Sequence, residues 1–133
     1  MSTETRIEAG HELDVLVAEE VMGWTHDRKR AHQVSDGDDW KWVTGWRLGN
    51  EEWLHEFPPA YYSTSYEGMG LVLERMKTLG WGMHLDSIAV RTDWSADFMA
   101  FGQPNAPRVF ASAPTLPHAV ALAALAAVRA VKE

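Results

Sequence analysis

The sequence PAYYSTSYEGMGLVLERMKTLGW, residues 59–81, contains the signals for one complete helix and for the strand after it. Thr64 and Glu67 stand three positions apart, which is the spacing of a capping box at the start of a helix. Apolar residues then recur every three or four positions. Gly80 supplies a left-handed stop. The stretch therefore predicts a helix over residues 65–79, followed directly by a strand.

A second helical pattern lies near the N-terminus. Leucines and valines within residues 12–22 form one apolar stripe, while the acidic residues, Asp14 among them, point away from it. Residues 25–60 follow with little periodicity, apart from a short strand or hairpin around residues 40–44. This middle segment is therefore predicted to be mostly irregular.

The second half of the chain predicts three short strands and a final helix. Alternating residues indicate strands over 81–91, 95–101 and 108–112, and the short turns between them favour antiparallel pairing. Thr115 caps a helix over 116–132. Together these elements predict an α+β class, with helices packed on both faces of a mainly antiparallel sheet of three to four strands.

The final helix carries no polar side chain between Ala119 and Val128. A helix that is apolar around its whole circumference is covered on more than one side. Either the aromatic segment within residues 25–60 or a second subunit supplies that cover. From the second alternative we predict a homo-oligomer that forms through residues 116–131.

Length and composition indicate a single soluble domain. The 133 residues suffice for one core, so we expect one domain over residues 9–133, preceded by a flexible tail over 1–8. The absence of cysteine fits a reducing compartment. The longest apolar run is much shorter than the roughly 18 residues that a membrane helix needs. These features predict a cytoplasmic protein with no membrane partner.

The net charge of −7 lies entirely in the first 60 residues, which carry thirteen acidic and six basic side chains. Such a field repels a phosphate backbone. The predicted order over residues 64–131 is also that of double-stranded-RNA-binding domains, which grip phosphates with basic residues at the start of their last helix. Here that helix begins Leu116-Pro117-His118-Ala119. We therefore predict no nucleic-acid partner.

Neither the histidines nor the acidic residues show the spacing of a metal site. No two of the six histidines have the i, i+4 separation of a helical zinc site. The cluster Asp36, Asp38 and Asp39 lacks the distal glutamate of a calcium loop, because Arg47 stands there, and so predicts a polar turn. Nucleophile elbows, Walker loops and dinucleotide fingerprints are also absent from the sequence. We predict no metal, no cofactor and no catalytic residue.

Aromatic residues concentrate just before the central helix. Trp, Tyr and Arg dominate the contact energy of interfaces, although packing of the same rings in the core explains them equally well. The residues predicted to bind a ligand or partner are Trp42, Trp46, Arg47, Trp53, Tyr61 and Tyr62.

Three stretches keep the order and spacing of a known family: Leu13 to Trp24; Pro59 through the helix that closes at Leu79-Gly80-Trp81; and Ala111 to Thr115 leading into Ala123-Ala124-Leu125. Together they resemble the phage ABA-sandwich domain, a small family encoded in phages and prophages. The resemblance implies helices on both faces of a mainly antiparallel sheet, and a phage or prophage origin. It implies no reaction and no catalytic residues.

Three hypotheses of function follow from these observations. The first is a phage or prophage accessory protein that binds a host protein or a small ligand and is not an enzyme. The second is a sponge that sequesters a nucleotide-type signal at an oligomer interface through Arg47, Arg91 or Arg108. The third is a small hydrolytic enzyme that uses Asp86, Asp93 and Asp97.

Overall fold

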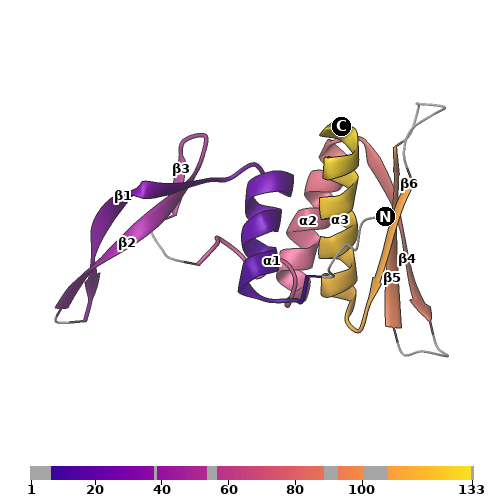
Figure 1. The fold of residues 1–133 in the computed structure, drawn as a ribbon, viewed down its shortest axis with the longest axis horizontal. Helices are drawn as coiled ribbons and strands as arrows, with labels where there is room; N and C mark the ends of the chain where they lie inside the picture. The colour runs from indigo at the N-terminus through magenta and orange to yellow at the C-terminus, as the bar shows by residue number, and fades with distance from the viewer. Residues whose placement is uncertain (1–6, 38, 54–56, 89–92, 101–107, 133) are drawn as a thin grey trace.

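Figure 1 shows the computed structural model of the chain, which describes residues 7–37, 39–53, 57–88, 93–100 and 108–132. The elements, in chain order, are α1 (His11–Leu16), the π-helical turn η1 (Val17–Val21), β1 (Thr25–Asp36), β2 (Asp39–Leu48), β3 (Glu51–Trp53), α2 (Tyr66–Thr78), β4 (Trp81–Ile88), β5 (Asp93–Ala100), β6 (Arg108–Ala113) and α3 (Leu116–Lys132). The strands form two antiparallel sheets, in the orders β1-β2-β3 and β4-β5-β6. The predicted α+β class is confirmed.

The helices lie between the two sheets (Figure 1). α3 packs on β5 and β6, α2 packs on β4 and α3, and η1 packs on α3. The C-terminal sheet is therefore covered by helices on one face, whereas the sequence predicted one sheet of three to four strands with helices on both faces. The difference arises because β1, β2 and β3 pair with one another and form a second sheet at the far side of the helices.

The central helix α2 forms close to its predicted bounds, but its cap lies one residue later than predicted. Ser65 is the N-cap, and its hydroxyl accepts a hydrogen bond from the Gly68 backbone N–H at 2.9 Å. The predicted capping box of Thr64 and Glu67 is therefore wrong. The predicted stop is confirmed, because Gly80 has a φ of 95° directly after the C-cap.

The N-terminal helix also differs from its prediction in one side chain. Asp14, predicted to point outward, is almost fully buried. The backbone N–H and the hydroxyl of Ser63 each donate to its Oδ1 at 2.7 Å. The same hydroxyl accepts from the Gly10 backbone N–H at 2.9 Å. A buried carboxyl needs hydrogen-bond partners, and Ser63 supplies them here. Since Ser63 precedes α2, this buried polar cluster joins α1 to the segment before α2.

The apolar helix α3 forms the centre of the core. Its residues from Ala119 to Leu125 are buried, apart from a half-buried Leu122, and they pack against Ala96 and Phe98 of β5. The C-terminal sheet covers one side of α3, and α1, η1 and α2 cover the other. Neither the aromatic segment nor a second subunit is needed as cover. Homo-oligomerisation through residues 116–131 stays a prediction, and the surface that suggested it is buried within one chain.

The long hairpin of β1 and β2 extends away from the helices (Figure 1). The sequence predicted only a short strand or hairpin around residues 40–44 in this region. Asp36 pairs with Asp39 at its tip, and Gly37, with a φ of 69°, lies between them. The register shifts once, between Asp27 and Ala31. None of the helices in the described ranges is long and apolar enough to cross a membrane.

Candidate functional site

An open groove with a volume of about 360 Å³ lies between β3 and the start of α2. Its walls are Trp53, the segment 57–61, and the residues Ser65, Glu67, Gly68 and Leu71 at the start of α2. We call this surface the aromatic groove. Large apolar side chains that line it remain exposed: Trp53 by 40 %, Phe57 by 49 %, Tyr61 by 61 % and Leu71 by 45 %. A cluster of such side chains around a concave surface is typical of a binding site.

The wall formed by residues 57–61 is stiffened by local sequence and held by a hydrogen bond. Pro58 and Pro59 fix their backbone φ angles, and Pro58 is buried. The indole N–H of Trp53 donates to the Phe57 carbonyl oxygen at 3.0 Å. This bond links β3 to the segment across a short stretch of chain. The hydrogen bond therefore fixes Trp53 of β3 relative to the wall formed by residues 57–61.

Gly68 allows the same segment to approach the helix closely. A Cβ atom at this position would overlap the carbonyl oxygen of Tyr61. That carbonyl also accepts from the Ser65 hydroxyl at 2.8 Å and from the Ser65 backbone N–H at 3.2 Å. A Cβ atom at Gly70, in contrast, would lie in open space. The backbone of Tyr61 is thus fixed against α2, and its ring lies exposed at the groove.

The six predicted binding residues divide between the groove, the core and the strand β2. Trp53 and Tyr61 both line the groove. Trp46 is fully buried, with its ring stacked 4.3 Å from that of His26, and Tyr62 is also buried, so neither is available to a partner. Arg47 is exposed on β2 and pairs with Glu52 at 3.5 Å. Trp42 also belongs to β2, and its side chain lies outside the described part of the structure.

Several groove residues are absent from the set predicted from the sequence. Phe57 and Pro58 lie close in sequence to the predicted aromatic residues. The Pro58-Pro59 pair also indicated a stiff segment that could form one wall of a groove. Leu71 was the clearer signal, because it is an apolar residue off the core-facing stripe of α2. A large apolar side chain on the solvent face of an amphipathic helix indicates a contact surface. Glu67 was predicted to cap the helix and not to line a site.

Tyr62 lies behind the groove, in the buried cluster with Asp14. Burial is the largest cause that raises the pKa of Tyr62 to about 12, the negative charge of Asp14 adds to it, and a hydrogen bond with the Trp24 side chain opposes it. Burial likewise raises the pKa of Asp14, against the two hydrogen bonds from Ser63. The cluster is internally bonded and almost closed to solvent, so we assign it a structural role.

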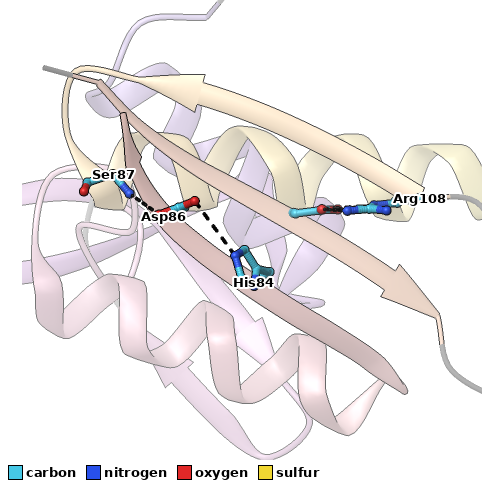
Figure 2. A network of polar contacts seen from close by, with 5 residues as sticks. His84, Asp86, Ser87 and Arg108 are labelled. Atoms are coloured by element: carbon cyan, nitrogen blue, oxygen red, sulfur yellow. Dashed lines mark hydrogen bonds and ion pairs between the residues drawn. The ribbon is translucent and has the colours of Figure 1, made fainter. Parts of the chain in front are cut away.

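The outer face of the C-terminal sheet carries a separate polar network (Figure 2). Arg108 of β6 donates to Asp97 Oδ2 of β5 from Nε at 3.0 Å and from Nη2 at 2.6 Å. These hydrogen bonds, and then the carboxylate charge, raise the pKa of Arg108. His84 and Asp86 lie beside them on β4, with Nε2 and Oδ2 4.0 Å apart. The Arg108–Asp97 pair links β6 to β5 on the face opposite the helices, whereas the His84–Asp86 contact lies within β4.

The same face of the sheet contains residues that were predicted for the hydrolytic enzyme and for the nucleotide sponge. Asp86, Asp93 and Asp97 fall on the outer face by strand register, and Asp97 is already held by Arg108. Arg91, predicted for a nucleotide site, lies outside the described residues. Among those that are described, no group of three or more His, Asp or Glu side chains is arranged to hold a metal ion.

No family model matches the sequence, and no curated protein sequence matches it. Among solved structures, the crystal structure of a phage protein from Bacillus cereus ATCC 14579 is similar, with a TM-score of 0.61. The two chains are 16 % identical, and the match covers 96 % of this chain and 99 % of that chain. This likeness shows a shared fold. The assignment to the phage ABA-sandwich family stays a resemblance.

Proposed function

We propose that this protein is a phage or prophage accessory protein that acts by binding another protein through the aromatic groove. The observation that carries the proposal is the exposure of Trp53, Phe57, Tyr61 and Leu71 around one concave surface. The end-to-end fold match with a phage protein supports the phage origin. A cytoplasmic location in the host cell is part of the proposal.

A protein segment suits the groove better than a small ligand. Sites for small molecules bury most of the ligand surface within enclosed walls. Here the main apolar walls stay 40 to 61 % exposed, so the groove is open to solvent and is not an enclosed cavity. Aromatic anchors around an open groove are typical of sites that bind an extended stretch of another protein. The unit bound is therefore proposed to be a short peptide segment of the partner.

The other two hypotheses have less support from the described contacts. A nucleotide sponge needs arginines that can face a phosphate, whereas Arg47 pairs with Glu52 and Arg108 is bound by Asp97 through two nitrogens. A hydrolytic enzyme needs a carboxylate that can transfer a proton, and Asp97 is engaged by the same arginine. We therefore favour binding over catalysis.

A peptide-display selection tests the proposal. Random twelve-residue peptides are selected on the immobilised protein and counter-selected on the Leu71→Asn variant, which replaces an apolar side chain of the groove wall with a polar, uncharged one. Peptides that survive are titrated by calorimetry against wild type and Tyr61→Ala. We expect the Tyr61→Ala substitution to weaken binding by about tenfold or more, as truncation of an aromatic anchor does.

The matched control is Tyr66→Ala. Tyr66 is as exposed as Tyr61 and begins α2, but it does not line the groove. Its truncation should leave the affinity unchanged. A peptide pool that the counter-selection empties, or surviving peptides that bind Tyr61→Ala as tightly as wild type, would contradict the proposed function, because the groove would then contribute nothing to recognition.

A further inference from the structure

The aromatic groove has an acidic side chain among its rings. Glu67 lies in the first turn of α2, is exposed, and lines the groove together with Tyr61, Phe57 and Trp53. Of the groove residues that the structure describes, none is a lysine or an arginine. The chemical character of this described surface is therefore apolar and aromatic, with a negative charge at one side.

Aromatic rings combined with a carboxylate form a recognition site for an organic cation. The face of a tyrosine or tryptophan ring attracts a lysine ammonium or an arginine guanidinium, and arginine also stacks on the ring plane. A carboxylate beside the ring forms a charge-assisted hydrogen bond with the same group. Of the described groove rings, that of Tyr61 is the most exposed and so the most accessible to such a cation.

The net charge of the chain acts in the same direction. Residues 1–60 carry the whole net charge of −7. Glu51 and Glu52 are exposed on β3, directly before the groove residue Trp53, and Glu52 pairs with Arg47. An excess of negative charge near a binding surface attracts cationic partners and repels anionic ones.

We infer that the partner segment carries an arginine or lysine that stacks on Tyr61 and pairs with Glu67, while its apolar neighbours contact Leu71. This inference rests on the proposed function and specifies the chemistry of its partner. It defines the recognised unit as a basic, partly apolar peptide. Acidic segments are disfavoured by the same charge.

The peptides from the display selection supply the test. Their composition is compared with that of the unselected library, and each arginine of a selected peptide is replaced by citrulline, which keeps the shape and removes the charge. Affinities are measured for wild type, Glu67→Gln and Glu74→Gln. Glu74 is an exposed glutamate further along α2 that does not line the groove, so Glu74→Gln is the matched control.

We expect groove-dependent peptides to be enriched in arginine or lysine. Citrulline and Glu67→Gln should each weaken them by about threefold to tenfold, and Glu74→Gln should leave them unchanged. The effect of Glu67→Gln should shrink at high salt, because the pair is exposed to solvent.

Two results would overturn the inference. One of them leaves the proposed function intact, and the other rejects it as well. Groove-dependent peptides that lack a cation, or that bind Glu67→Gln as tightly as wild type, would reject the basic segment and leave the proposed function intact. A selection that yields no groove-dependent peptide would reject the proposed function and this inference with it.

Discussion

Asp14 is the residue at which burial and charge conflict most directly. Burial raises its pKa, although Ser63 donates two hydrogen bonds to the carboxyl. A raised pKa in the folded state means that the folded protein binds this proton more tightly than the unfolded chain does. The stability that protonated Asp14 contributes is therefore fully present below about pH 3.9 and is lost as the pH rises through the folded pKa.

The variant Asp14→Asn isolates this effect, because an amide oxygen still accepts from Ser63 but has no proton to lose. We expect the stability of wild type relative to Asp14→Asn to fall as the pH rises from about 3 toward neutral. Urea unfolding of both proteins across this range gives the difference at each pH. A difference that stays constant, or that grows in favour of wild type, would contradict the assignment.

Tyr62 should show a similar effect at alkaline pH. Its pKa of about 12 exceeds that of a tyrosine in the unfolded chain, so the folded state favours the protonated phenol. Between about pH 10 and pH 12, wild type should lose stability relative to Tyr62→Phe. Denaturant unfolding at alkaline pH measures this directly. Parallel stability curves for the two proteins would show that Tyr62 is not buried as described.

Gly68 and Gly70 lie two residues apart in α2 and predict opposite results when replaced by alanine. At Gly68 a Cβ overlaps the backbone of Tyr61, so Gly68→Ala should destabilise the protein by about 1–3 kcal/mol. At Gly70 the space is open, so Gly70→Ala should stabilise the helix by up to about 1 kcal/mol. Thermal unfolding compares them. Equal effects would remove the argument that Gly68 positions the groove wall.

Among the helices and strands, those with strong periodicity were predicted well. α2 and α3 lie within a residue of their predicted bounds, and β5 presents Ala96 and Phe98 to the core as its alternation indicated. The strand β1 was not predicted, because its sequence THDRKRAHQVSD contains no apolar alternation. Its register comes from pairing with β2, which a local pattern does not reveal.

Because α3 packs between the sheet and the other helices, the effect of an alanine-to-leucine substitution on stability should depend strongly on its position in the helix. Ala123 is fully buried and Ala126 is exposed on the same helix. Ala123→Leu should destabilise the protein by about 1–3 kcal/mol, because a well-packed core does not accommodate the added volume. Ala126→Leu should change stability by less than about 0.5 kcal/mol. Chemical denaturation that finds the two variants equally stable would contradict the described placement of α3.

In the molecule as a whole, the groove could be predicted only in part. Tyr61 and Tyr62 are adjacent in sequence, yet one lies exposed at the groove and the other is buried beside Asp14. Trp46 and Trp53 are paired across β2 and β3, yet Trp46 is buried in the core and Trp53 is exposed at the groove. Composition identified the aromatic segment, whereas the division between core and surface depends on how β3, the Pro58-Pro59 segment and α2 meet.

Site-specific photo-crosslinking tests whether the groove is the binding surface. A benzoyl-phenylalanine is placed at Tyr61 or, as a control, at Phe110, which is equally exposed but lies on the outer face of the C-terminal sheet. Both proteins are irradiated in the cell that carries the gene. We expect an adduct of one discrete mass at Tyr61, lost with Leu71→Asn, and none at Phe110. An adduct at Phe110 with none at Tyr61 would contradict binding through the groove.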